Sequence, residues 1–149
     1  MPKDKWEALW RRPVPDTPKP RRKRAKRSDL EGPVVRECLL WLASRPEVKL
    51  IERRNTGAVQ FSDGRFLRFG AKGRADIWCL VATTKGSIGD EVSVLEHVEI
   101  ECKRRDGKGK LSPAQRDFQD QCGADDIPHF VATSAEDLEQ KLKKACLIT

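Results

Sequence analysis

Apolar and polar positions change their spacing along the chain, and these changes predict helices alternating with strands. Between residues 28 and 45 apolar positions recur every three or four residues, which predicts a first helix. Residues 112–121 are expected to form a second helix, because Ser112 suits an N-cap and Pro113 suits the first helical position. Residues 134–145 have the pattern of a closing amphipathic helix.

Strand patterns lie between these helices. The segments expected as strands are residues 48–54, 59–61, 65–69, 76–82, 94–103 and 130–132. Turn residues separate the second segment from the third, which is typical of a hairpin. The fourth segment (DIWCLVA) is apolar on both faces, as in a central strand. We therefore predict an α/β fold with a mixed central sheet flanked by helices.

The beginning of the chain follows neither pattern. Residues 1–29 hold 11 Lys and Arg against 4 Asp and Glu, so the whole net charge of +7 arises there. Five of the nine prolines lie in the same stretch. Proline removes backbone donors and like charges repel, so residues 1–27 are expected to form a basic, Pro-rich flexible arm. Residues 28–149 are expected to form one domain.

Several classes of protein can be set aside. No apolar run approaches the length of a membrane span, and the charged N-terminus lacks the apolar region of a secretory signal. The five cysteines show no C-x-x-C spacing and lie partly in apolar runs, which favours free thiols in a reducing compartment. The chain has no phosphate-binding loop of the G-x-x-x-x-G-K-[ST] type and no G-x-S-x-G nucleophile motif.

The segment HVEIECK, residues 97–103, carries the strongest chemical signal. Alternation along a strand places His97, Glu99, Glu101 and Lys103 on one face and the apolar residues on the face toward the core. An ordinary edge strand with a solvated face would show the same pattern. Asp76 favours a functional site over an ordinary edge strand, because a carboxylate at the start of a central strand is costly when buried unless it binds a cation.

Together these residues form an acid followed, after 24 intervening residues, by Glu-x-Lys on the next long strand. A phosphodiester is anionic and resists attack, so a nuclease needs a divalent cation to neutralise charge and to generate hydroxide. Mg²⁺ prefers oxygen ligands and keeps several waters, so Asp76 and Glu101 suffice to hold it. Lys103 on the same face can hold the attacking water or stabilise the developing negative charge.

This pattern resembles the acid…Glu-x-Lys core of the PD-(D/E)xK nuclease superfamily, and the surrounding sequence resembles its VRR-Nuc branch. The resembling stretches are residues 54–58 (RNTGA), 68–76 (RFGAKGRAD), 99–103 (EIECK) and 109–115 (GKLSPAQ). The chain has Ala75 at the position where the superfamily pattern has a structural proline. The resemblance implies a restriction-endonuclease-like fold and a nuclease domain over residues 28–149.

The resemblance also implies roles for single residues. Asp76 and Glu101 would be metal ligands, with the backbone carbonyl of Cys102 as a third, and Lys103 would be the catalytic cation. Glu31 would complete the metal shell, unless it closes a capping box with Ser28. Gln115 would lie near the scissile phosphate, unless it is a surface residue of its helix.

Basic residues near these positions are the expected DNA contacts. Candidate DNA-binding residues are Arg53, Arg54, Asn55, Lys72, Arg74, Arg104, Arg105, Lys108 and Lys110. The last four belong to a basic loop that directly follows the Glu-x-Lys strand, where cations can grip phosphates beside the site. Asn55 has a second interpretation, as a residue favoured in the turn that Asn-Thr-Gly forms.

We therefore expect a Mg²⁺- or Mn²⁺-dependent endodeoxyribonuclease that cuts Holliday or other branched junctions, because stand-alone relatives in the family resemble homodimeric junction resolvases. Branched or duplex DNA and a second copy of the chain are the expected partners, with no membrane and no small-molecule cofactor. The alternatives are a non-catalytic basic nucleic-acid-binding protein, and a flap nuclease, restriction-like enzyme or exonuclease on the same fold. A cytoplasmic phage or bacterial setting is expected, or the nucleus if residues 21–27 are an import signal.

Overall fold

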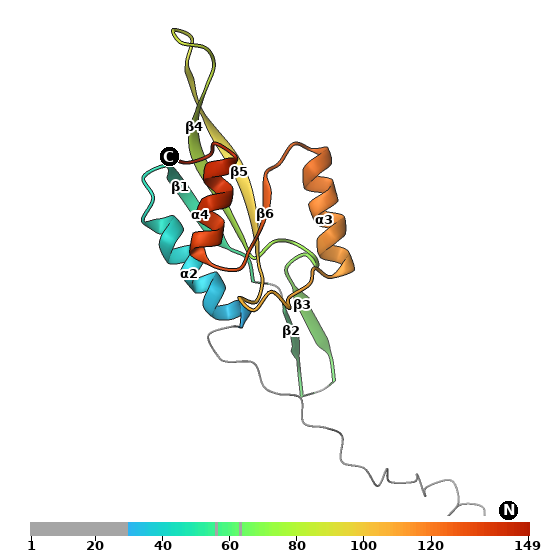
Figure 1. Ribbon diagram of the computed structural model, residues 1–149. Coiled ribbons are helices and arrows are strands. Elements are labelled where there is room, and N and C mark those ends of the chain that lie inside the picture. Colours follow the sequence, from blue (N-terminus) through green and yellow to red (C-terminus); the bar gives the residue numbers. More distant parts are fainter. Residues whose placement is uncertain (1–29, 56, 63) are drawn as a thin grey trace, which may run out of the picture.

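The computed structural model describes residues 30–149 except Thr56 and Asp63. In chain order the elements are α2 (Glu31–Ala43), β1 (Val48–Arg53), β2 (Gly57–Gln60), β3 (Phe66–Phe69), β4 (Ile77–Lys85), β5 (Val92–Cys102), α3 (Pro113–Ala124), β6 (His129–Ala132) and α4 (Ala135–Lys144) (Figure 1). The basic arm predicted over residues 1–27 lies outside the described residues.

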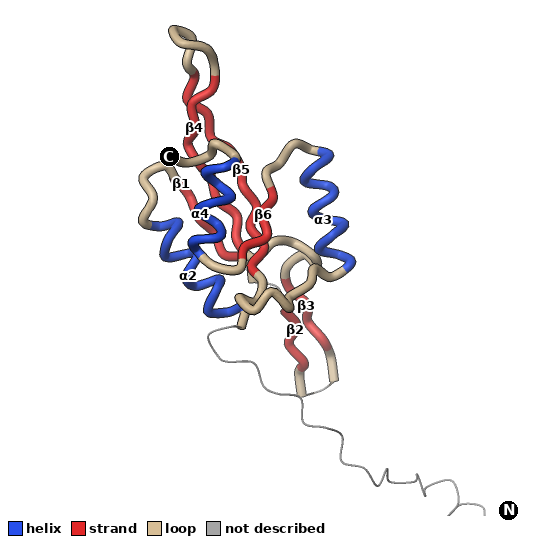
Figure 2. The backbone as a smooth tube through the Cα atoms, in the orientation of Figure 1, coloured by secondary structure: helices blue, strands red, loops and turns tan. Residues whose placement is uncertain are grey.

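A four-stranded mixed sheet forms the centre of the fold, in the order β1-β4-β5-β6. Its first two pairings are antiparallel and the last, between β5 and β6, is parallel. Helices α2 and α4 lie side by side on one side of the sheet, and α3 lies apart from them next to β6 (Figure 2). The prediction of a mixed sheet flanked by helices is confirmed, and residues 77–82 of the segment predicted over 76–82 lie in a central strand, with Asp76 directly before it.

The main core fills the space between the sheet and the helices α2 and α4. Alternate residues of the two central strands are fully buried there: Ile77, Cys79 and Val81 from β4, and Val98, Ile100 and Cys102 from β5. The predicted orientation of the last three toward the core is confirmed. A second small cluster lies under α3, where Ala75 packs with Phe118 and Cys122. The opposite face of β5 carries the polar side chains of the HVEIECK segment, whereas the opposite face of β4 carries Trp78, Leu80 and Ala82.

Two local details differ from the sequence prediction. Helix α2 begins at Glu31 with Leu30 at its N-cap and has no side-chain cap, so Glu31 is the first helical residue rather than the third one of a capping box. Ser28 lies outside the described residues. Strand β1 does not alternate strictly, because its register against β4 shifts between Val48 and Leu50. The shift turns Ile51 toward the core and leaves Leu50 about half exposed, at 48%.

The strands of the two hairpins begin and end at different residues from those that the sequence predicts. The predicted hairpin is confirmed as β2 paired with β3, separate from the main sheet. Strands β4 and β5 pair as far as Lys85 and Val92, well beyond the predicted strand end at residue 82, and project from the body as a ribbon (Figure 1). Ile88 at the tip of this ribbon is fully exposed.

The described residues also show the state of the cysteines and the character of the helices. All five cysteines are free thiols, four of them buried and Cys146 exposed. None of the helices in residues 30–149 combines the length and the apolar character needed to cross a bilayer.

Candidate active site

The predicted acidic residues meet at one end of the two central strands. Asp76 directly precedes β4, and Ile77 pairs with Ile100, so the antiparallel register brings Asp76 opposite the residues that follow Ile100. The backbone N–H of Cys102 donates a hydrogen bond of 2.8 Å to Asp76 Oδ2. Asp76 is fixed from the other side by β1, because its carbonyl accepts from the N–H of Arg54 at 2.8 Å.

Lys103 lies at the centre of the cluster and is only 5% exposed. Its Nζ is 2.7 Å from Glu101 Oε1 and 3.6 Å from Glu31 Oε1. It also donates a hydrogen bond of 3.2 Å to Gln115 Oε1. Side chains from the first turn of α2, the end of β5 and the first turn of α3 therefore converge on one ammonium group.

The N-terminus of α3 holds Gln115 in place through a capping box, as Ser112 and Pro113 predict. Ser112 Oγ accepts from the N–H of Gln115, and Gln115 Oε1 accepts from the N–H of Ser112 at 2.8 Å. The other end of the Gln115 amide, Nε2, donates to Glu101 Oε1. One side chain thus ties the start of a helix to the buried acid and to Lys103.

Glu101 is 2% exposed and its second oxygen, Oε2, has no hydrogen-bond partner among the described residues. Burial raises the pKa of Glu101 to about 7, and the charge of Asp76 adds to the rise although Lys103 opposes it. Burial also raises the pKa of Asp76, partly against the hydrogen bond from Cys102. Burial is therefore the main reason that both acids resist ionisation where they lie.

The pKa of Lys103 moves in the opposite direction. Burial would lower it, but the hydrogen bond to Glu101 and the charges of the surrounding carboxylates outweigh burial and raise it above the ordinary value of 10.5. Lys103 therefore remains protonated at neutral pH, which suits it to stabilise negative charge rather than to accept a proton.

The carboxylate oxygens of the cluster suit a hard divalent cation that takes only one or two of its ligands from the protein. Within the described residues no group of three or more His, Cys, Asp and Glu side chains is arranged to hold a metal ion. Mg²⁺ needs only one or two carboxylates, because it keeps most of its waters. Asp76 and the orphaned Oε2 of Glu101 provide two such oxygens, and both acids gain from a nearby positive charge.

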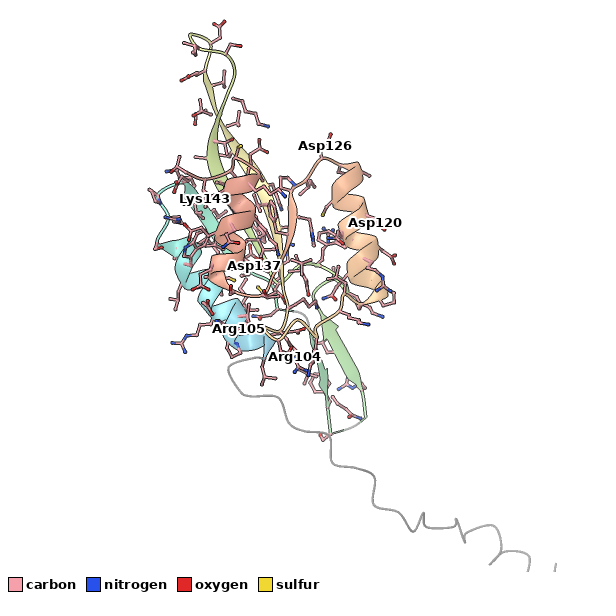
Figure 3. The ribbon with its side chains drawn as sticks, viewed as in Figure 1. Arg104, Arg105, Asp120, Asp126, Asp137 and Lys143 are labelled. Carbon is pink, nitrogen blue, oxygen red and sulfur yellow. The ribbon has the colours of Figure 1, made fainter. Side chains whose placement is uncertain are left out.

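The basic loop after β5 lies against the cluster. A Cβ at Gly109 would come within 3.2 Å of Lys103 Cβ, so the loop passes directly over the stem of that side chain. Figure 3 shows Arg104 and Arg105 together near the start of α2. Arg104 pairs with Asp106 at 2.6 Å and Arg105 pairs with Glu37, so both are anchored at their tips.

The other predicted DNA-binding residues surround the cluster at different degrees of exposure. Six are exposed: Arg53, Asn55, Lys72, Arg74, Lys108 and Lys110. Arg53 is close enough for its charge to oppose, in small part, the rise that burial causes in the pKa of Asp76. Arg74 covers the ring of Phe118, with its guanidinium carbon 4.6 Å from the ring centroid.

The sequence predicts Arg54 as a DNA contact, but in the structure its guanidinium group forms an ion pair with a buried carboxylate. The two terminal nitrogens of its guanidinium, Nη1 and Nη2, each donate to one carboxylate oxygen of Glu99, which is 2% exposed. Glu99 Oε1 also lies 2.8 Å from His97 Nε2, and the His97 ring stacks on Trp78 at 5.1 Å. Strand alternation indicates that Glu99 shares a face with Glu101, but Arg54 and Glu99 are 45 positions apart, so the sequence does not reveal their pairing.

Comparisons of the chain with protein-family models, with curated proteins and with solved structures found no match. The interpretation of the cluster therefore depends on its own geometry and on the sequence resemblance described above.

Proposed function

We propose that this protein is a metal-dependent DNA endonuclease of the VRR-Nuc type. The observation that carries the proposal is the convergence of Asp76, Glu101 and Lys103 at one end of two neighbouring strands, with an unsatisfied Glu101 oxygen in the cluster. A buried carboxylate oxygen without a donor is costly in a protein of only structural role. A cation bound beside it relieves that cost.

The fold supports the same proposal. A helix, three antiparallel strands, a helix and a final parallel strand build a mixed sheet with its acids at one end. This arrangement is compatible with the restriction-endonuclease-like fold that the sequence resemblance implies.

Asp76 and Glu101 would hold the cation, together with the carbonyl of Cys102, and Glu31 is near enough to contribute. When bound, Mg²⁺ or Mn²⁺ would supply charge neutralisation of the phosphate and acidification of water. Lys103 would donate to a phosphate oxygen or hold the attacking water, and its raised pKa keeps the proton needed for this. Gln115 would keep the Lys103 ammonium aligned with Glu101.

The proposed substrate is DNA with a branch. Residues 30–149 carry 19 charges of each sign, so backbone affinity would depend on local basic groups around the site and on the N-terminal arm. Cutting two symmetric strands of a junction requires two equivalent sites, which a two-fold homodimer would present.

The test is cleavage of a four-way junction, a flap and a linear duplex of matched sequence with Mg²⁺ or Mn²⁺. We expect preferential cutting of the junction by the wild type, and no cutting by Lys103→Ala at near wild-type junction affinity. Lys144→Ala, at an exposed position of α4, is the matched control and should cut normally. Equal cutting of all three DNAs would contradict the preference for junctions, and absence of cutting would contradict the nuclease.

One observation favours a second candidate, a nucleic-acid-binding protein without catalytic activity. Glu101 Oε1 and one oxygen of Asp76 already have partners within the protein, so the cluster could be a closed structural network. In that case Lys103→Ala would reduce stability and DNA binding together, and no divalent cation would support cleavage.

A further inference from the structure

A small pocket lies beside the candidate active site, between the sheet and α3. Its volume is about 140 Å³. The pocket is walled by the Arg54–Glu99 pair and His97 on the sheet side, and by Arg74, Phe118, Gln121 and Asp125 on the other. We call it the α3 pocket. None of the roles proposed above for the metal ligands, for Lys103 or for Gln115 uses it.

The size of the α3 pocket limits its ligand to about one ring. Pockets for larger ligands occupy roughly 300–1,000 Å³. An engineered protein cavity of about 150 Å³ accepts benzene. The α3 pocket is in this smaller class, so it fits one planar ring and excludes a whole nucleotide.

The charges around the pocket favour a neutral ligand over an anion. The guanidinium groups of Arg54 and Arg74 are matched by the carboxylates of Glu99 and Asp125. Glu99 is already neutralised by Arg54 through two hydrogen bonds. A phosphate would therefore meet Asp125 and a closed ion pair beside the single guanidinium of Arg74, rather than a cluster of several unpaired cations.

The surfaces of the pocket favour a flat group with polar edges. Arg74 lies over the ring of Phe118, and a guanidinium plane stacks well on an aromatic ring. Phe118 and Cys122 provide an apolar floor, whereas the exposed side chains of Gln121 and Asp125 provide donors and acceptors at the rim. A nucleobase has this combination of a π face and hydrogen-bonding edges.

The pocket lies along the strand that carries the candidate catalytic residues. Glu99 and Glu101 are two residues apart on the same face of β5, a rise of about 7 Å. A strand of DNA with its phosphate at Lys103 would therefore have an adjacent base within reach of the pocket. Arg54 and Arg74, which the sequence predicts only as DNA contacts, both line this pocket.

We propose that the α3 pocket binds one unpaired nucleobase of the DNA strand that occupies the candidate active site. This inference rests on the proposed function, and it adds a reason for branch selectivity. A base in a continuous duplex must be unstacked and unpaired to enter, at a cost of a few kcal/mol, whereas a base at a branch point is already exposed.

The test measures binding in EDTA, so that no cleavage occurs. Two flap DNAs are compared that differ only at one unpaired position next to the branch, which carries either a base or an abasic site. We expect the wild type to bind the DNA with the base about 5- to 100-fold more tightly, as for stacking of one base on an aromatic surface. Arg74→Ala and Gln121→Ala should each bring this ratio close to one.

Asp120→Asn is the matched control, because Asp120 lies on α3 but does not line the pocket (Figure 3). It should keep the wild-type ratio, and thermal unfolding should show that all variants are folded. A wild-type ratio of one overturns the pocket proposal. So does a large ratio that survives both Arg74→Ala and Gln121→Ala, because the base is then recognised elsewhere.

The two proposals fail separately. Cleavage of branched DNA with Mg²⁺ together with a ratio of one overturns the pocket and leaves the nuclease. A large ratio that both pocket variants abolish, in a protein that cuts no DNA with Mg²⁺ or Mn²⁺, overturns the nuclease and supports the pocket as a base-binding site.

Discussion

Glu101 shows at the residue scale which property of the cluster supports the proposed cation site. Three carboxylates surround Lys103, so the cluster carries more negative than positive charge. The buried Glu101 responds with a pKa of about 7 and an oxygen without a donor. A single ammonium cannot satisfy all three acids, and this imbalance is the property that supports metal binding most directly.

Gly73 allows the loop before Asp76 to approach α3. Its φ is +86°, and an added Cβ would lie 2.4 Å from the carbonyl oxygen of Ala114. Gly64 has the same φ with open space around it. We expect Gly64→Ala to cost about 1–2 kcal/mol from backbone strain alone. Gly73→Ala should cost about 2–5 kcal/mol, because overlap with α3 is added to the strain.

Urea unfolding of the two variants measures this difference. Equal losses would show that Gly73 is needed only for its backbone conformation and not for its contact with α3.

Asp137 predicts a pH dependence of stability. Partial burial opposes its ionisation, but hydrogen bonds from Lys141 and from Thr133 outweigh burial and lower its pKa below the ordinary value of 3.8. The stabilisation is therefore complete at pH values well above 4 and is lost as the pH falls through the lowered pKa. We expect Asp137→Asn to be less stable than wild type at pH 7 and the difference to shrink at acidic pH, as the pH falls well below the ordinary carboxyl pKa of 3.8.

Chemical denaturation at both pH values checks this expectation. Asp117→Asn, at an exposed position of α3, controls for the loss of one charge. A difference between wild type and Asp137→Asn that is constant with pH would contradict the argument.

At the scale of elements, α3 serves the site through its first turn. The capping box stabilises the helix and at the same time fixes the amide of Gln115 against Glu101 and Lys103. Folding of the helix end and alignment of the site are therefore one event.

Substitutions in the capping box separate its two roles. Ser112→Ala should cost about 1 kcal/mol of stability and leave most of the cleavage activity, because Gln115 still reaches the site. Gln115→Ala should cost a similar amount of stability and also lower the rate of DNA cleavage. Equal activity in the two variants would show that Gln115 has only a capping role.

Elements whose partners are near in sequence could be predicted well. The Ser-Pro start of α3 and the alternation of β5 are local signals, and both were interpreted correctly. The shift in β1 and the start of α2 at Glu31 depend on packing against distant segments. The candidate site combines both cases. Asp76, Glu101 and Lys103 follow from local patterns, whereas the pairing of Arg54 with Glu99 joins distant segments and could not be predicted from the sequence.

At the scale of the whole molecule, charge is divided between two regions. The first 29 residues contain all of the excess positive charge, whereas residues 30–149 are balanced. If the N-terminal arm binds DNA, it provides most of the affinity that depends on salt, and the domain provides the geometry of the cut.

Replacing the six Lys and Arg of residues 21–27 with Gln tests this division. Each neutralised phosphate contributes about −0.9 to the slope of log affinity against log salt, so the slope should become less steep by about 5. Binding to a junction between about 50 and 200 mM salt measures it. Lys143→Gln with Lys144→Gln, on α4, is the control, and an unchanged slope in the arm variant would favour an import signal instead.

The alternation of β5 has a consequence for engineering. Cys102 lies in the main core, between Glu101 and Lys103 on the same backbone. A larger side chain at this position would move the strand by tenths of an ångström, and both neighbours would move with it. Attempts to make the protein more heat-resistant by refilling this layer will therefore also move the candidate active site, so such designs should begin at α2 or α4 instead.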